Sequence, residues 1–230
     1  MLPVQLGGPV APIRSVLAVG AHCDDIEIGC GGTLLRLIEE HHPLSVHWLV
    51  LSGTPPRADE AAASAAAFLS GIDSQVVVRD FRDGFFPWSG YEIKEVFEEL
   101  KDAVTPDVVF THRREDAHQD HRLVAELTWN TFRNHLIVEY EIPKYEGDLG
   151  APNLFVPLSA PTCSRKIELI LKHFPSQRSR QWFDSETFWS VLRLRGLESN
   201  SPTKYAEGFS CRKLVLPMES PGGRRRTDPQ

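Results

Sequence analysis

The chain has 230 residues, of which 41% are hydrophobic and 24% are charged. These values are ordinary for a globular protein and provide enough apolar side chains for a full core. The formal net charge of −6 argues against a nucleic-acid partner held through its phosphates. We expect a single domain over residues 14–218, between a flexible N-terminus (1–13) and a disordered tail (219–230).

Cysteine usage and the N-terminal sequence bear on the cellular compartment. The cysteines at positions 23, 30, 163 and 211 form no Cys-x-x-Cys pair, so neither a disulfide framework nor a structural zinc site is expected. The first residues lack the basic start and apolar core of a signal peptide. No apolar run approaches membrane-spanning length. We therefore expect a cytoplasmic protein without a membrane span.

The first half of the chain alternates apolar runs with helical patterns. Strands buried on both faces are predicted at residues 15–20, 45–51, 75–79 and 107–111. Helices are predicted at residues 32–40, 57–69, 91–104 and 121–132. A repeat of about thirty residues is typical of βα units. The predicted fold is α/β, with a Rossmann-like, doubly wound, mostly parallel sheet flanked by helices.

The second half is less regular. Several prolines divide residues 142–162 into loops and short extended pieces. Helices are predicted over residues 164–174 and about 185–197, and late strands over 205–209 and 213–216. We expect this less regular C-terminal part to belong to the same domain.

Two clusters of His and Asp follow the first and the fourth predicted strands. They are Ala21-His22-Cys23-Asp24-Asp25 and Asp116-Ala117-His118-Gln119-Asp120-His121. The patterns His-x-Asp-Asp and His-x-Asp-His occur together by chance on the order of once in a thousand chains. In the common strand order 3-2-1-4, strands 1 and 4 flank the switch point, where ligands bind beyond the carboxyl ends of the strands. The two clusters should therefore converge on one crevice.

Imidazole and carboxylate groups at this spacing suit one catalytic Zn²⁺ ion per chain, and another divalent metal would also be accepted. We expect three protein ligands, with the fourth position open to water. The expected ligands are His22, Asp25 and His121. Such a site polarises a carbonyl group and lowers the pKa of water. The pattern therefore predicts a metallohydrolase.

The remaining polar residues of the clusters suit acid–base work. Asp24 would act as the general base towards the zinc-activated water. His118 would donate to a developing oxyanion or to the leaving group. Asp120 would orient one of the imidazoles, and Asp116 would orient another.

Ordinary structural interpretations compete with these roles. An isolated Asp25 would most often cap the following helix. His112 is interpreted as a solvated loop residue. Gly29, Gly31 and Gly32 do not form the dinucleotide fingerprint Gly-x-Gly-x-x-Gly, and we expect them to let the backbone pass close to the metal.

The first cluster is similar to the Ala-His-Pro-Asp-Asp signature of the LmbE-like, or N-acetylglucosaminyl-phosphatidylinositol de-N-acetylase (PIG-L), family. Thr111-His112 with residues 116–122 resembles the second signature of that family. Further likeness lies at Ser52-Gly53, Arg57-x-x-Glu60, Arg82-Asp83-Gly84, Ser176-Gln177, Arg195-Gly196 and residues 206–209. The resemblance covers roughly residues 14–216. One departure is Cys23, which replaces the usual proline; a spectator thiol is expected, with an extra ligand or an oxidation-sensitive site as alternatives.

The resemblance implies a Rossmann-like, zinc-dependent hydrolase that removes acetyl groups from N-acetylated amino sugars and sugar conjugates. It also implies the metal ligands, base and oxyanion donor assigned above. Substrate-contacting positions would be Arg57 and Asp83, with Asp116 as a third candidate. The expected partner is a small N-acetylated sugar or glycoconjugate, and either a dimer or a hexamer is compatible with the fold.

Two other functions remain open at this stage. One is a zinc-dependent amidase or deacylase that tailors a secondary metabolite, which would use the same metal chemistry. The other is a non-catalytic sugar- or nucleotide-binding module on the same fold, which would need neither Asp24 nor His118. Trp88, Tyr91 and Tyr145 are interpreted equally as sugar-stacking residues or as core residues.

Overall fold

The computed structural model describes residues 4–7, 12–41 and 43–215. The expected tail at 219–230, residues 1–3 and 8–11 of the expected N-terminal segment, and residue 216 of the last expected strand lie outside this range. Among the described residues, no helix combines the length and apolar character needed to cross a membrane.

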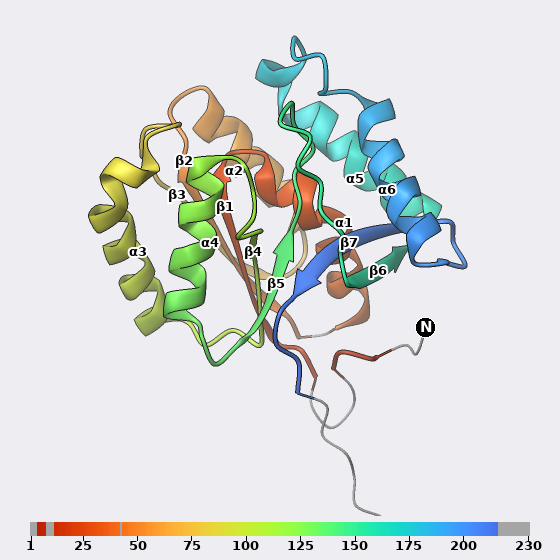
Figure 1. The fold of residues 1–230 in the computed structure, drawn as a ribbon, viewed down its shortest axis with the longest axis horizontal. Helices are drawn as coiled ribbons and strands as arrows, with labels where there is room; N and C mark the ends of the chain where they lie inside the picture. The colour runs from red at the N-terminus through yellow and green to blue at the C-terminus, as the bar shows by residue number, and fades with distance from the viewer. Residues whose placement is uncertain (1–3, 8–11, 42, 216–230) are drawn as a thin grey trace, which may run out of the picture.

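A sheet of seven strands lies at the centre of the described residues, in the order β3-β2-β1-β4-β5-β7-β6 (Figure 1). The first five strands are parallel: β1 (Ser15–His22), β2 (Ser45–Ser52), β3 (Asp73–Val78), β4 (Val108–His112) and β5 (Leu136–Tyr140). The other two are antiparallel additions: β6 (Leu154–Leu158) and β7 (Tyr205–Cys211). The predicted order 3-2-1-4 of the first four strands is confirmed, and so is the mostly parallel, doubly wound α/β class.

Helices cover both faces of the sheet (Figure 1). One face carries α1 (Asp25–Glu40), α2 (Arg57–Phe68), α5 (Ala160–His173) and α6 (Ser185–Glu198). The other carries α3 (Gly90–Ala103) and α4 (Gln119–Thr131). Two short 3₁₀ helices, η1 (Phe86–Ser89) and η2 (Pro175–Gln177), lie in connecting loops. The connecting helices switch from one face of the sheet to the other between β1 and β4, which are adjacent in the sheet.

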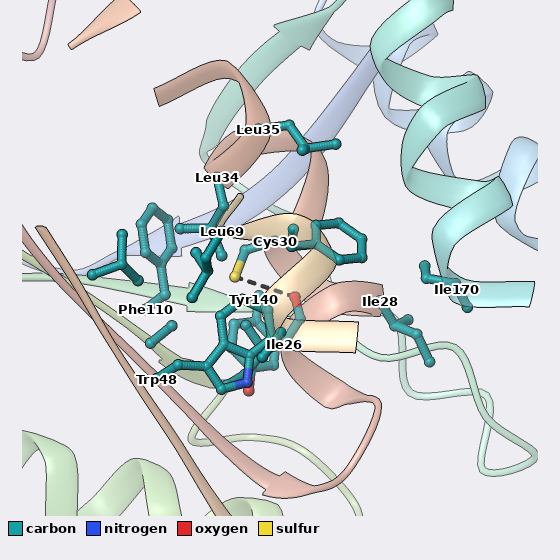
Figure 2. Packing of buried hydrophobic residues seen from close by; sticks show 14 of the residues in the cluster. Ile26, Ile28, Cys30, Leu34, Leu35, Trp48, Leu69, Phe110, Tyr140 and Ile170 are labelled. Atoms are coloured by element: carbon teal, nitrogen blue, oxygen red, sulfur yellow. Dashed lines mark hydrogen bonds between the residues drawn. The ribbon is translucent and has the colours of Figure 1, made fainter. Parts of the chain in front are cut away.

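Helix α1 begins at Asp25, seven residues before the predicted start at residue 32. Its first turns carry apolar side chains one helical turn apart, Ile26, Cys30 and Leu34, which belong to the same buried cluster as Trp48 and Tyr140 (Figure 2). The Cys30 thiol donates to the backbone carbonyl of Ile26, with Sγ and O 3.4 Å apart. Full burial of side chains of this size contributes about 1.5–3 kcal/mol each. This packing fixes the start of α1, and Asp25 with it, against the end of the sheet.

The C-terminal half differs from prediction in two strands. Residues 136–140 form β5, where no strand is predicted. The predicted strand at 213–216 is wrong for its described residues, because 213–215 have no strand pairing. β7 ends at Cys211, and the guanidinium of Arg212 turns to the Glu139 carboxylate, with Nε and Oε1 2.7 Å apart.

Candidate active site

The two His/Asp clusters meet at the carboxyl edge of β1 and β4. His22 ends β1, Asp25 opens α1, and His121 lies in the first turn of α4. His22 Nδ1 lies 3.1 Å from His121 Nε2 and 3.3 Å from Asp25 Oδ2. The distance between His121 Nε2 and Asp25 Oδ2 is 3.6 Å. Three donor atoms from three elements therefore form a nearly equilateral triangle.

The size of this triangle fits a zinc ion. Zinc–ligand bonds of about 2.0–2.2 Å place the ligand atoms of a tetrahedral site about 3.4 Å apart. At the distance between His22 Nδ1 and His121 Nε2, a proton or a cation must lie between the two nitrogens. Two imidazole lone pairs cannot face each other at this distance without a shared proton or a cation. The donor set and its spacing fit a bound divalent metal.

Burial and the mutual charges of these groups shift their protonation. Burial lowers the pKa of His121 to about 4, so its imidazole is neutral at pH 7. Burial alone would raise the pKa of Asp25, but His121, His112 and His22 together hold it well below the usual range. A neutral imidazole and an ionised carboxylate are the forms that bind metals. The pKa of His22 is raised well above 6.5, because Asp25 and Asp120 outweigh its burial, so metal binding there would release a proton.

His112 is the fourth imidazole of this cluster. It is fully buried, its Nε2 atom lies 3.1 Å from Asp25 Oδ2, and its ring stacks on that of His121 at a centroid distance of 3.9 Å. The interpretation of His112 as a solvated loop residue is wrong, because β4 extends through this position. Asp25, His112 and His121 are close enough to hold a metal ion as a group. However, the backbone N–H of Ala21 already donates to His112 Nε2 across 3.0 Å.

Asp24 faces different partners from its neighbour Asp25. It occupies the N-cap position of α1 but makes no capping hydrogen bond through its side chain. Asp25 is the first residue of the helix, so the interpretation of Asp25 as the cap is wrong. Arg57 donates through Nη2 to Asp24 Oδ1, with 2.9 Å between the two atoms. Burial raises the pKa of Asp24, and the charge of Arg57 opposes that rise. A buried carboxylate with one oxygen held in this way suits a general base.

His118 lies beside the triangle, with its ring centroid 4.9 Å from that of His22 and 4.7 Å from that of His121. It caps α4, because its Nδ1 atom accepts the backbone N–H of Asp120 at 3.3 Å. An imidazole that accepts at Nδ1 carries its proton on Nε2. Burial also lowers the pKa of His118, which favours this neutral form.

Asp120 joins the cluster to the loop that follows β3. Its carboxylate accepts the backbone N–H groups of Gly84 at 2.6 Å and Phe86 at 3.1 Å, and lies 3.4 Å from His22 Nε2. Asp83, on the same loop, lies 3.0 Å from that ring nitrogen, and its side chain is 72% exposed. Both carboxylates therefore contact the His22 nitrogen that faces away from the triangle, and Asp83 also faces solvent.

Asp116 contacts the outer ring nitrogen of His121, as Asp120 does for His22. Its Oδ2 atom lies 3.1 Å from His121 Nδ1, and its Oδ1 atom accepts the backbone N–H of His118 at 2.8 Å. The contacts with His121 help to hold the pKa of Asp116 below its usual range although burial opposes this. Its side chain is only 3% exposed, so the geometry supports orientation of an imidazole better than contact with substrate.

The thiol of Cys23 points out of this cluster. Its Sγ atom donates to the backbone carbonyl of Ser52 across 3.2 Å. Burial raises the pKa of Cys23 to about 11, so the thiol stays protonated at neutral pH. A protonated thiol held by a carbonyl is a poor metal ligand.

Three exposed aromatic side chains lie on the segments that follow β3 and β5. Trp88 and Tyr145 are 75% and 69% exposed, and Tyr91 is 73% exposed. The interpretation of these three as core residues is therefore wrong. Trp88 and Tyr91 lie on the segment anchored to Asp120 through Phe86 N–H.

Sequence comparison identifies the family. A family model described as PIG-L, GlcNAc-PI de-N-acetylase, matches residues 17–132, which include both His/Asp clusters. YaiS of Escherichia coli (strain K12), described as an uncharacterized deacetylase, is 30% identical over 138 residues, which are 56% of this chain and 75% of YaiS.

Solved structures share the fold. The conserved protein TT1542 of Thermus thermophilus is 25% identical, with a TM-score of 0.68 over 91% of this chain and 99% of its own. N,N'-diacetylchitobiose deacetylase of Pyrococcus horikoshii is 19% identical, with a TM-score of 0.62 over 87% and 84% of the two chains. GalB, the 4-carboxy-2-hydroxymuconate hydratase of Pseudomonas putida KT2440, is 17% identical, with a TM-score of 0.67 over 90% and 100%.

The fold alone does not define the reaction, because it is shared by a deacetylase and a hydratase. The family assignment rests on the sequence matches, and the matched range of the family model includes the residues of the triangle. This chain belongs to the PIG-L (LmbE-like) family of deacetylases.

Proposed function

We propose that the protein is a zinc-dependent N-deacetylase that removes the acetyl group of an N-acetylated amino sugar or glycoconjugate. The family supplies the deacetylase class. The observation that carries the metal-dependent mechanism is the triangle of His22 Nδ1, Asp25 Oδ2 and His121 Nε2.

These three atoms would hold the metal. A set of two imidazoles and one carboxylate leaves one tetrahedral position open, as catalytic zinc sites require. When bound, zinc makes water more acidic and polarises a carbonyl group. His112 is assigned a supporting role, because its Nε2 atom already accepts the Ala21 N–H and its ring is fully buried.

Asp24 would move the proton. It accepts a proton from the attacking water, whose oxygen forms a bond to the acetamide carbon. When the C–N bond breaks, the proton would pass from Asp24 to the amine nitrogen, so the free amine leaves together with acetic acid, which then releases its proton to solvent. Arg57 supports this role, because its contact with Asp24 Oδ1 stabilises the ionised carboxylate.

His118 would stabilise the oxyanion. Its Nδ1 atom accepts the Asp120 N–H, so the Nε2–H is free to donate to the developing negative charge on the carbonyl oxygen. Asp116 and Asp120 do not take part in proton transfer in this account. They contact the outer ring nitrogens of His121 and His22 and keep the inner nitrogens directed to the metal.

The sugar class is supported by a relative and by the surface around the site. The Pyrococcus horikoshii protein is named for deacetylation of N,N'-diacetylchitobiose. In this chain, Trp88 and Tyr91 are exposed on the segment that follows Asp83, and aromatic faces pack against the apolar faces of sugar rings. We also propose a reducing compartment such as the cytoplasm, since the four cysteines are free.

Acetate release under defined metal content tests the proposal. The full chain, loaded with one equivalent of zinc, would be incubated with N-acetylglucosamine, N,N'-diacetylchitobiose, and nucleotide- and lipid-linked N-acetylglucosamine. We expect zinc-dependent acetate release from at least one sugar and none from the chelated protein. Release from non-sugar acetamides alone would reject the sugar class, and equal release without metal would reject the mechanism.

A further inference from the structure

Lys144 lies on the loop between β5 and β6, and its ammonium group lies between one buried carboxylate, that of Asp116, and one half-buried carboxylate, that of Asp148. Its Nζ atom is 2.9 Å from Asp116 Oδ2 and 2.7 Å from Asp148 Oδ1. The three side chains are 12%, 3% and 15% exposed, in the order Lys144, Asp116 and Asp148. Because water reaches this group poorly, the charges interact more strongly than surface ion pairs do.

The two carboxylates hold the turn that precedes α4. Asp148 Oδ2 accepts the backbone N–H of Ala117 at 2.7 Å, and Asp116 Oδ1 accepts that of His118 at 2.8 Å. The second oxygen of Asp116 lies 3.1 Å from His121 Nδ1. A single lysine therefore contacts both carboxylates that hold this turn. One of them, Asp116, also contacts the proposed metal ligand His121.

The loop that carries Lys144 packs against the residue that follows β4. Arg113, which directly follows β4, donates through Nη2 to the carbonyl of Asp148 at 2.7 Å. At Gly150 an added Cβ would lie only 1.7 Å from Arg113 Nη1. The loop and the end of β4 thus pack without space between them, so the position of Lys144 is defined by close contacts.

Loss of the ammonium group would leave two carboxylates facing each other with little solvent. Like charges in such a site repel each other, so the two carboxylates would move apart. This movement would take Asp116 Oδ2 away from its contact with His121 Nδ1. The His121 ring would then lose the partner that keeps its Nε2 lone pair directed at His22 and Asp25.

We propose that Lys144 is a positioning residue of the zinc site, which acts through Asp116 to set the orientation of His121. This assignment rests on the proposed function, because it presumes that the triangle binds zinc. Zinc affinity of the full chain, measured by competition with a chromophoric chelator, is therefore the primary readout.

Lys144→Met should weaken zinc binding about ten-fold, the lower end of the effect of removing an outer partner of a metal ligand. Lys144→Arg keeps a cation between the carboxylates and should retain the affinity within a few-fold. The matched control is Lys94→Met, since Lys94 lies on α3, where it pairs with Glu98, and contacts Thr131 at the C-terminal end of α4. This control should bind zinc as the wild type does.

A double-mutant cycle shows whether Lys144 acts through Asp116. In an Asp116→Asn background, Lys144→Met should lower the affinity little further. An equal loss in both backgrounds, an unchanged affinity in Lys144→Met, or a ten-fold loss in Lys144→Arg would overturn the proposal. If Lys144→Met does not fold, the Lys144→Arg and Asp116→Asn measurements still decide it. Absence of zinc binding by the wild type would instead reject the proposed function.

Discussion

The Nδ1 atom of His22 and the Nε2 atom of His121 lie 3.1 Å apart, although 99 positions separate the two residues in the chain. This contact arises because β1 and β4 are parallel neighbours, so that the segments following them reach the same edge of the sheet. Asp25 completes the triangle from the first turn of α1. Because the three donor atoms come from three different elements, they meet only in the folded protein. A metal bound by all three would therefore favour the folded state.

Zinc should therefore stabilise the protein. A ligand present at one hundred times its dissociation constant adds about 2.7 kcal/mol to the free energy of unfolding. For a chain of this size, that is a rise of about 5–10 °C in Tm. Thermal unfolding with zinc and with chelator would measure the shift, and His22→Ala, which removes one corner of the triangle, should abolish it. Equal Tm values with zinc and chelator in the wild type would contradict the site.

Cys23 should be dispensable. Its thiol donates to the backbone carbonyl of Ser52, and burial raises its pKa to about 11. Cys23→Ala should keep one zinc per chain and retain activity within a few-fold. Metal analysis and acetate release on the purified variant check this. Loss of stoichiometric zinc would show that the thiol is a ligand.

Removal of Arg57 should shift the pH dependence of the rate. Activity requires ionised Asp24, so the rate falls as the pH drops through the pKa of that carboxyl group. Arg57 lowers this pKa through its charge, so Arg57→Gln should raise it and move the acid limb of kcat/KM to higher pH. Zinc content should not change. An acid limb that stays in place, or moves to lower pH, would exclude Asp24 as the titrating base.

Asp120 should contribute to stability and loop position as well as to the orientation of His22. Asp120→Ala leaves the backbone N–H groups of Gly84 and Phe86 without their acceptor, and each unsatisfied buried group costs about 1–3 kcal/mol. Urea unfolding should show that loss, with a higher KM because the loop carries Asp83. Asp120→Asn keeps one acceptor oxygen and should lose less. A fully stable Asp120→Ala would argue against the anchor.

Much of the site is predictable because local sequence defines it. Apolar runs identify strands β1 and β4, and in a parallel α/β sheet the segments that follow such strands converge. His22, Asp25 and His121 are found together as expected from their positions alone. The predicted start of α1 is too late, since the helix begins directly at the first His/Asp cluster, where His, Cys and Asp carry no helical apolar pattern.

The residues that sequence reasoning missed depend on tertiary contacts. His112 resembles a polar loop residue, yet it ends a buried strand and stacks on His121; the buried run of β4 was the only local signal. Lys144 and Asp148 lie in a proline-interrupted loop with no periodicity, and only the packing of that loop on Arg113 brings them to Asp116. β5 was missed because it is short and contains Glu139, which is buried by pairing with Trp129 and Arg212.

The most direct test separates holding the metal from using it. Zinc content and deacetylase rate would be measured together for His22→Ala, Asp25→Ala, His121→Ala and Asp24→Asn. The three triangle variants should lose both zinc and activity. Asp24→Asn should keep one zinc per chain, because Asp24 contacts Arg57 rather than the triangle, while its rate falls by about two to four decades, as expected for a lost general base. If Asp24→Asn lost its zinc while Asp25→Ala kept it, the two aspartates would have to exchange roles, and if all four variants kept zinc and activity, the metal-dependent mechanism would be wrong.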